Sequence, residues 1–166
     1  YLLSPVGEPF SWPYHQHAPM AGEDGEILLF DNGNYRASPF TGDPELAPPE
    51  TWSRAVAYQV DEENMEVRQT LEFADTSVGR LFCDGRGDAD YLANGNVLVN
   101  FGHSSSRDGI PNADLGFGTR EVHLVELNPA GDIIWELAIT SPSDISPEGW
   151  TANRVQRITS LYSPSN

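Results

Sequence analysis

The chain has 166 residues with 15 glycines and 13 prolines, a composition that argues against a helical bundle or a coiled coil because both residues disfavour helix interiors. Its 25 acidic residues outnumber nine basic residues, all of them arginine, and the net charge of −16 disfavours nucleic acids and anionic lipid surfaces as partners. Hydrophobic residues make up 39% of the chain, enough for a folded core, but no apolar run approaches the ~20 residues that a membrane-spanning helix needs.

The first half of the chain alternates hydrophobic and polar residues, which is typical of half-buried β-strands. We expect strands over residues 26–30, 52–60 and 66–73. Polar segments at 31–34, which reads Asp-Asn-Gly-Asn, and at 61–64 are turn signals that end two of them. The pattern therefore predicts antiparallel strands joined by turns.

The second half repeats this layout, with strands expected over 96–101, 121–127 and 132–139. When the halves are aligned, Gly25 falls on Gly95 and each copy holds four short strands. A four-stranded meander repeated in tandem is typical of the blades of a β-propeller. A sandwich or an up-and-down barrel is the alternative, although sandwiches seldom show such an internal repeat.

We therefore predict an all-β fold in which residues 1–166 are the C-terminal part of a single β-propeller domain. The approximate blades are 15–75 and 87–140, and a closing strand is expected at about 152–162. Two blades do not close a propeller, so further N-terminal blades of the same protein are expected. Expressed alone, residues 1–166 would expose strand edges and are expected to self-associate.

Two of the four histidines stand where a propeller would bring them together. His17 lies at the start of the first strand of the first copy, and His103 lies just past the second strand of the second copy. The first strand of each blade lines the central channel of a propeller, and loops at strand ends form its rim. His17 and His103 are therefore expected to converge on one mouth of the channel.

We predict neither a metal site nor a cofactor. Asp108, Asn112 and Asp114 offer oxygen ligands in one loop, but their spacing fits no known calcium loop and favours a solvated acidic segment. Cys83 is the only cysteine, so the chain has no internal disulfide.

Several motifs resemble the arylsulfotransferase family. They are Gln16-His17-Ala18, the run from Gly25 to Asn34 followed by Arg36, the run 52–61, and the run 88–99. The resemblance extends from about Tyr14 to Tyr162. Members of this family transfer a sulfuryl group from an aryl sulfate to a phenol without 3′-phosphoadenylyl sulfate.

The resemblance implies a six-bladed propeller whose central channel holds a transiently sulfurylated histidine. His17 matches the supporting histidine of the family, Arg36 matches its arginine, and His103 is the nearest match to the nucleophile. The match at His103 departs from the family pattern because Ser104, Ser105 and Ser106 follow it. Another site histidine would lie upstream of Tyr1. The resemblance also implies a periplasmic or extracellular protein.

Sulfuryl transfer resembles phosphoryl transfer, because a trigonal group with charge spread over its oxygens passes between two oxygen atoms. Arg36 suits the neutralisation of that charge, since a guanidinium stays protonated and pairs with two oxygens. Arg54 is either a second cation for the substrate or part of a structural ion pair. Tyr14 and Tyr35 are candidates to stack on the aryl ring, and core packing is the alternative role for such aromatic residues.

The sequence thus favours an enzyme that moves a sulfuryl group from an aryl sulfate donor to a phenolic acceptor through sulfo-histidine. Its expected partners are small molecules, with no nucleic acid and no membrane span in this chain. The alternatives are a non-catalytic propeller that acts as scaffold or ligand-binding module, and a sulfate-ester hydrolase in which water replaces the phenol.

Overall fold

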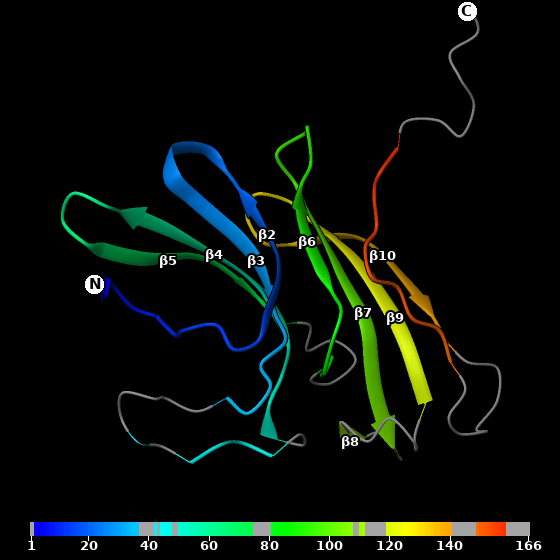
Figure 1. The fold of residues 1–166 in the computed structure, drawn as a ribbon. Coiled ribbons are helices and arrows are strands. Elements are labelled where there is room, and N and C mark those ends of the chain that lie inside the picture. Colours follow the sequence, from blue (N-terminus) through cyan, green and yellow to red (C-terminus); the bar gives the residue numbers. More distant parts are fainter. Residues whose placement is uncertain are drawn as a thin grey trace, which may run out of the picture.

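The molecule is described here from a computed structural model. The structure describes residues 2–36, 42, 44–47, 50–74, 81–107, 110–111, 119–140 and 149–158. Within these ranges the chain forms two β-sheets that lie beside each other and no α-helix (Figure 1).

The first sheet is an antiparallel meander with one short strand added in parallel at its edge. Its order is β1-β5-β4-β3-β2, and β1 pairs in parallel with β5. A single 3-10 turn, η1 (Glu23–Gly25), joins β2 to β3. The strands are β1 (Ser4–Pro5), β2 (Gln16–Ala21), β3 (Glu26–Asp31), β4 (Arg54–Asp61) and β5 (Glu66–Phe73).

The second sheet is a meander of the same kind. Its order is β10-β9-β7-β6, with the short strand β8 paired to the end of β7. The strands are β6 (Asp88–Tyr91), β7 (Val97–Arg107), β8 (Ile110–Pro111), β9 (Thr119–Leu127) and β10 (Ile133–Ile139).

The repeated meander confirms the prediction of an all-β fold for the described residues. In each sheet the chain passes from one strand to the antiparallel strand beside it. The order is β2 to β5 in the first sheet and β6, β7, β9 and β10 in the second. Neither sheet closes into a barrel within the described part of the chain, which argues against the up-and-down barrel. The propeller and the division into blades stay predictions.

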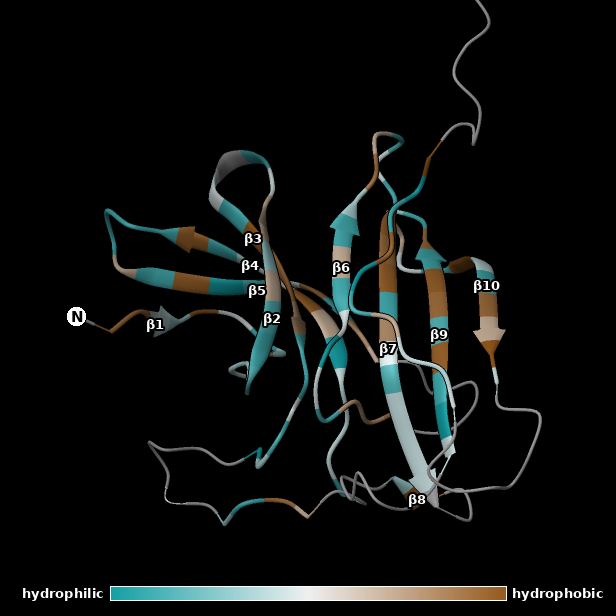
Figure 2. Ribbon diagram, turned by 45° about the vertical axis from the view of Figure 1, so that its right-hand side comes forward, coloured by the Kyte–Doolittle hydropathy of each residue, from teal (hydrophilic) through white to brown (hydrophobic). Residues whose placement is uncertain are grey.

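The main core lies between the two sheets. Successive side chains of a strand point to opposite faces, so Leu28 and Phe30 of β3 face the second sheet while Leu29 faces away from it. The rings of Phe30 and Phe101 meet edge to face with centroids 5.4 Å apart. Figure 2 shows hydrophobic stretches on β3, β7 and β9. This packing sets β3 beside β6 and brings Phe30 of β3 against Phe101 of β7, the strand that contains His103.

The outer face of the first sheet packs against the N-terminal segment. Leu29, Val56, Tyr58 and Val67 form a second buried cluster, which Leu3, Phe10, Trp12 and Val60 cover in part. The ring of Phe10 contacts the ring of Trp12 edge to face at 4.9 Å between centroids. Both faces of this sheet are therefore apolar, as expected for a sheet that is covered on two sides.

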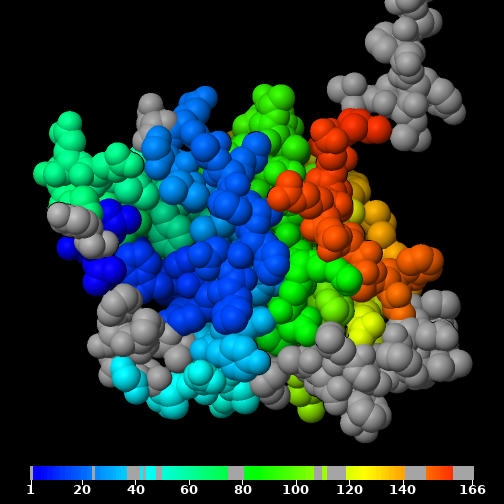
Figure 3. Space-filling view, in the orientation of Figure 1, coloured from blue at the N-terminus to red at the C-terminus, as the bar shows by residue number. Residues whose placement is uncertain are grey.

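Residues 149–158 cross the outer face of the second sheet, where Figure 3 shows them in orange to red. The N–H of Ala152 donates to the carbonyl of Gly102 at 2.8 Å, and Arg157 pairs with Glu126 of β9. The closing strand expected at about 152–162 is not formed over residues 152–158, and the rest of it lies outside the described residues. Among the described residues the segment makes isolated hydrogen bonds across the face of β7 and β9 and has no partner strand, so the closing strand stays a prediction.

Strand β10 is an exposed edge of the second sheet. All seven of its residues are exposed, including Ile134 and Trp135, whose relative exposures are 53% and 46%. No helix of the described residues is long and apolar enough to cross a membrane.

Candidate functional site

The loop over residues 81–87 connects the two sheets and is held from both sides. The N–H of Cys83 donates to Ser53 Oγ at 2.8 Å, and Cys83 also forms an isolated antiparallel bridge with Ser104 of β7. Asn32 Nδ2 donates to the carbonyls of Cys83 and Arg86, both at 2.8 Å. Because these contacts come from both sheets, the backbone of the loop has a fixed position between them.

His17 is linked to this loop through Asn32, the residue that follows β3. It lies in β2 opposite Phe30, at a register shift between His17 and Met20, and its side chain is exposed. Its Nδ1 atom contacts Asn32 Oδ1. The Asn32 NH₂ group already donates to two carbonyls, so its Oδ1 acts as the acceptor and His17 Nδ1 carries the proton. The nitrogen of His17 that faces away from Asn32 is therefore Nε2.

His103 reaches the same loop from the second sheet. The structure places it inside β7, whereas the sequence pattern predicts a position just past the strand. The difference comes from a register shift between Phe101 and Ser104, after which β7 continues to Arg107. Gly102 sits in this bulge so close to the segment 149–158 that a Cβ atom there would lie 1.8 Å from the carbonyl oxygen of Ala152.

The side chain of His103 is buried and faces a carboxylate. Its relative exposure is 7%, and its Nδ1 atom lies 3.4 Å from Oδ1 of Asp84. Burial lowers the pKa of His103; Asp84 opposes this shift, while Arg86 and Arg120 add to it. The Nε2 atom has no hydrogen-bond partner among the described residues. His103 is therefore a neutral imidazole at neutral pH, with its second nitrogen free of hydrogen bonds to the described part of the chain.

Asp84 is a residue that the sequence analysis did not select. It stands in Cys83-Asp84-Gly85, where a carboxylate before a glycine reads as an ordinary turn residue. Nothing in its spacing from His103 indicates that the two meet, because the contact depends on how the loop crosses between the sheets.

Arg36 lies in a buried ionic cluster of the first sheet. Its Nη2 atom is 3.0 Å from Oδ2 of Asp31 and donates to the carbonyl of Trp52 at 3.1 Å. The guanidinium carbon lies 4.5 Å from the ring centroid of Trp52 and 5.4 Å from that of Tyr14. The Nε and Nη1 atoms of Arg36 have no hydrogen-bond partner among the described residues. One edge of this buried guanidinium thus carries donors that the described residues leave unpaired.

Each nitrogen of the Arg54 guanidinium faces a protein group, and Nη1 does so through an ion-pair contact without a hydrogen bond. Its Nε atom is 2.8 Å from Oδ2 of Asp31, and its Nη1 atom is 3.1 Å from Oε1 of Glu72. Its Nη2 atom donates to the carbonyl of Ser11 at 3.1 Å and to Tyr58 Oη at 3.3 Å. Burial alone would lower the pKa of Arg54, but the carboxylates raise it. With a side chain that is 0% exposed, these contacts favour the structural ion pair over contact with a substrate.

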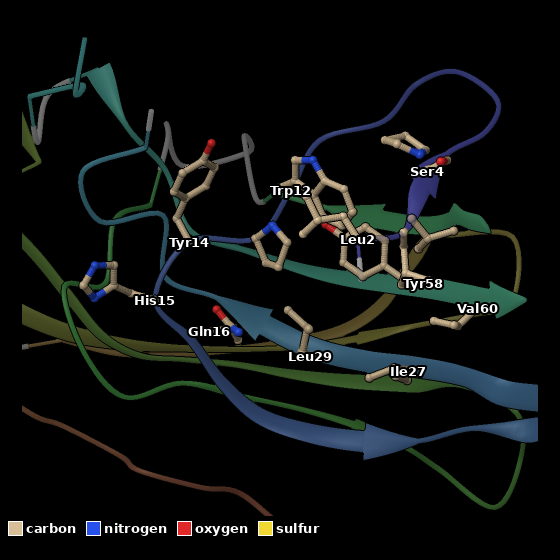
Figure 4. Close-up of a pocket in the computed structure, with 14 residues that line it drawn as sticks. Leu2, Ser4, Trp12, Tyr14, His15, Gln16, Ile27, Leu29, Tyr58 and Val60 are labelled. Atoms are coloured by element: carbon tan, nitrogen blue, oxygen red, sulfur yellow. The ribbon is translucent and has the colours of Figure 1, made fainter. Parts of the chain in front are cut away.

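A pocket of about 870 Å³ lies on the outer face of the first sheet (Figure 4). Residues 2–5 and 12–16 form one side of it, and Leu29 and Tyr58 belong to its floor. Tyr14 lines the pocket, whereas Tyr35 is 61% exposed and lies edge to face against His15 at 5.7 Å between centroids. The two candidate aromatic residues thus occupy different surroundings.

The structure brings His17, through Asn32, and His103, through Asp84, to the loop 81–87. Arg36 lies in the segment that follows β3 of the same sheet, four residues after Asn32. No group of three histidine, cysteine or acidic side chains in the described ranges is arranged to hold a metal ion. Asp108, Asn112 and Asp114 lie outside the described residues.

The sequence matches the family model described as Arylsulfotransferase (ASST) over residues 1–123. The chain belongs to the arylsulfotransferase family. The matched segment contains His17, Arg36, Arg54 and His103, and it ends within β9. Membership confirms the resemblance found in the motifs and supports a sulfotransferase-type enzyme. A search of the curated proteins found no match.

Proposed function

We propose that this arylsulfotransferase transfers a sulfuryl group from an aryl sulfate to a phenol through a covalent intermediate on His103. The observation that carries the proposal is the state of His103, which is buried, neutral and without a hydrogen bond at Nε2 among the described residues. A buried polar atom without a partner costs about 1–3 kcal/mol, so its presence calls for a functional explanation.

In the first half-reaction the lone pair of His103 Nε2 attacks the sulfur atom of the aryl sulfate. The N–S bond forms as the S–O bond to the aryl group breaks, and the aryl oxide leaves and takes a proton from the solvent. The solvent regains this proton when His17 releases the one that it accepts in the second half-reaction. The imidazole ring becomes positively charged while its Nδ1 proton stays in place. Asp84, 3.4 Å from Nδ1, compensates that charge.

In the second half-reaction a phenol attacks the sulfur atom of the sulfo-histidine. Its proton passes to His17, whose Nε2 atom is the basic nitrogen because Nδ1 faces Asn32 Oδ1. The N–S bond then breaks, and His103 returns to the neutral form. Splitting the transfer in this way is the ping-pong route.

Arg36 has the features of the anion-binding group. Its Nε and Nη1 edge makes no hydrogen bond to the described residues, and its Nη2 atom is anchored by Asp31. A guanidinium anchored in this way binds two sulfonate oxygens with little loss of side-chain entropy. Tyr14 lies under this guanidinium and lines the apolar pocket, which makes it a better candidate than the exposed Tyr35 to contact the aryl ring.

The repeated meander and the family also support the wider proposal. In it, residues 1–166 contribute about two blades, 15–75 and 87–140, to a six-bladed propeller that the same protein completes with N-terminal blades. The proposed location is periplasmic or extracellular, by analogy with the family alone.

The test is the incubation of the intact protein with 4-nitrophenyl sulfate and a phenol acceptor. We expect release of 4-nitrophenol together with a sulfated acceptor, and loss of both in the His103→Ala variant. His123→Ala is the matched control, because His123 lies in β9 and faces Glu121. If the wild type releases no 4-nitrophenol, a binding module is favoured. Release of free sulfate without a sulfated acceptor would favour a hydrolase. Full activity of His103→Ala would exclude His103 as nucleophile.

A further inference from the structure

The loop 81–87 carries one acidic side chain, and this side chain faces His103. Asp84 Oδ1 lies 3.4 Å from His103 Nδ1, with the Asp84 side chain 15% exposed and the His103 side chain 8% exposed. This separation is loose for a hydrogen bond, as is common for catalytic contacts before a substrate binds. Asp84 Oδ1 is buried and makes no hydrogen bond to any described residue, so its 3.4 Å contact with His103 Nδ1 is an ion-pair contact.

The backbone around Asp84 is fixed more firmly than that of an ordinary surface turn. Its carbonyl accepts from Asn34 Nδ2 at 2.6 Å, and the N–H of Ser105 donates to the carbonyl of Phe82 at 3.2 Å. At the far end of the loop, a Cβ atom on Gly87 would lie 2.3 Å from the ring of Phe30. Hydrogen bonds and close packing from both sheets therefore hold the carboxylate on the Nδ1 side of the imidazole.

We propose that Asp84 is the positioning residue of the nucleophile: its carboxylate holds the proton on His103 Nδ1, and so keeps the lone pair on Nε2, the atom that attacks sulfur. The inference rests on the proposed function for its chemical consequence, but its structural content is the tautomer of His103. A neutral imidazole has one protonated nitrogen, and a carboxylate beside Nδ1 favours the proton there. The same carboxylate stabilises the ring when it becomes positive during transfer.

The tautomer can be measured without any turnover. In the described part of the chain the charged groups that face His103 are Asp84 and Arg86 of the loop and Arg120 of β9. The neighbouring Cys83 thiol has a pKa raised by burial to about 12. Imidazole nitrogen NMR shifts of the intact protein should show His103 protonated at Nδ1. In Asp84→Asn the pKa of His103 should fall further, because the opposing carboxylate is gone, and the Nδ1 tautomer should lose its dominance. An Nε2-protonated ring in the wild type would overturn the inference.

The kinetic test uses 4-nitrophenyl sulfate and a phenol acceptor with the intact protein. We expect Asp84→Asn to lower kcat by about 100-fold with little change in KM, the size of effect typical of a misplaced proton-transfer group. Asp90→Asn is the matched control, because Asp90 is a half-buried carboxylate of β6 that does not face His103. A kcat within about twofold of the wild type in Asp84→Asn would overturn the inference while leaving the proposed function intact.

Failure of the proposed function gives a different result. In that case the wild type releases no 4-nitrophenol and the kinetic part of the inference falls with it, whereas the NMR comparison still decides whether Asp84 sets the tautomer of His103.

Discussion

Replacement of Arg54 by methionine is the sharpest test of the ionic cluster in the first sheet. Arg54 is completely buried, and it is one of two arginines that share the buried carboxylate of Asp31. Methionine keeps an unbranched apolar stem of similar length, so the change removes the charge and five polar contacts with little loss of packing. Asp31 is then left with Arg36 as its remaining cation in the described residues.

The expected cost follows from the burial of both partners. Removal of one member of a buried ion pair typically costs about 3–5 kcal/mol, because the other charge stays buried without compensation. Arg36 still contacts Asp31 Oδ2 at 3.0 Å and Glu72 is 34% exposed, so we expect the lower part of that range, about 3 kcal/mol. For a chain of this size, that corresponds to a fall in Tm of roughly 6–12 °C.

The measurement is thermal and chemical unfolding of the intact protein followed by circular dichroism. The control is Arg68→Met, because Arg68 lies on the neighbouring strand β5 with an exposed side chain and should change the free energy of unfolding by less than about 0.5 kcal/mol. Equal stabilities of the two variants would refute the interpretation of Arg54 as a structural ion-pair residue.

Three further predictions follow from single residues. The folded state lowers the pKa of His103, so the unfolded state binds more protons just below about pH 6.5 and the free energy of unfolding should fall as the pH drops through that value. His103→Gln should reduce this dependence of the free energy of unfolding on pH in denaturant titrations. An unchanged pH dependence would argue against the buried neutral imidazole. Burial raises the pKa of the Cys83 thiol to about 12, so a thiol reagent at pH 8 should label the protein only after unfolding, and rapid labelling of the native state would contradict the position of Cys83 in the core. Gly33→Ala should lower the free energy of unfolding by more than about 2 kcal/mol, because φ is +77° and the new Cβ would lie 2.1 Å from the Trp52 carbonyl oxygen. Gly131→Ala, with φ +85° and no close neighbour, should lower it by about 1 kcal/mol. Equal losses would argue against the close approach at Gly33.

Much of the fold could be predicted from the alternation of side chains. Strands β3, β5 and β9 begin and end within about two residues of the expected ranges, because their apolar residues repeat with the period of a pleated strand. Strand β7 runs to Arg107, well past the apolar run that ends at Phe101. The serines that extend it carry no hydrophobic pattern, and they stay in the strand through pairing with β9 after a bulge.

The site could be predicted only in part for a related reason. His17 and Arg36 carry recognisable motifs, and each stands next to a turn whose position the sequence indicates. The contacts of Asp84 with His103 and of Arg54 with Asp31 join residues that are not neighbours in sequence, so tertiary packing decides them. Nothing local distinguishes a buried, paired arginine in a strand from one that meets a substrate.

The central claim is that His103 carries the sulfuryl group between donor and acceptor. The most direct measurement incubates the intact protein with an aryl sulfate in the absence of a phenol, followed by rapid quenching at alkaline pH and mass analysis of the peptides. The account predicts one added SO₃ group on the peptide that contains His103, lost again when a phenol is supplied before the quench. A sulfuryl group on a different residue, or a protein that turns over substrate while no peptide gains mass, would contradict it.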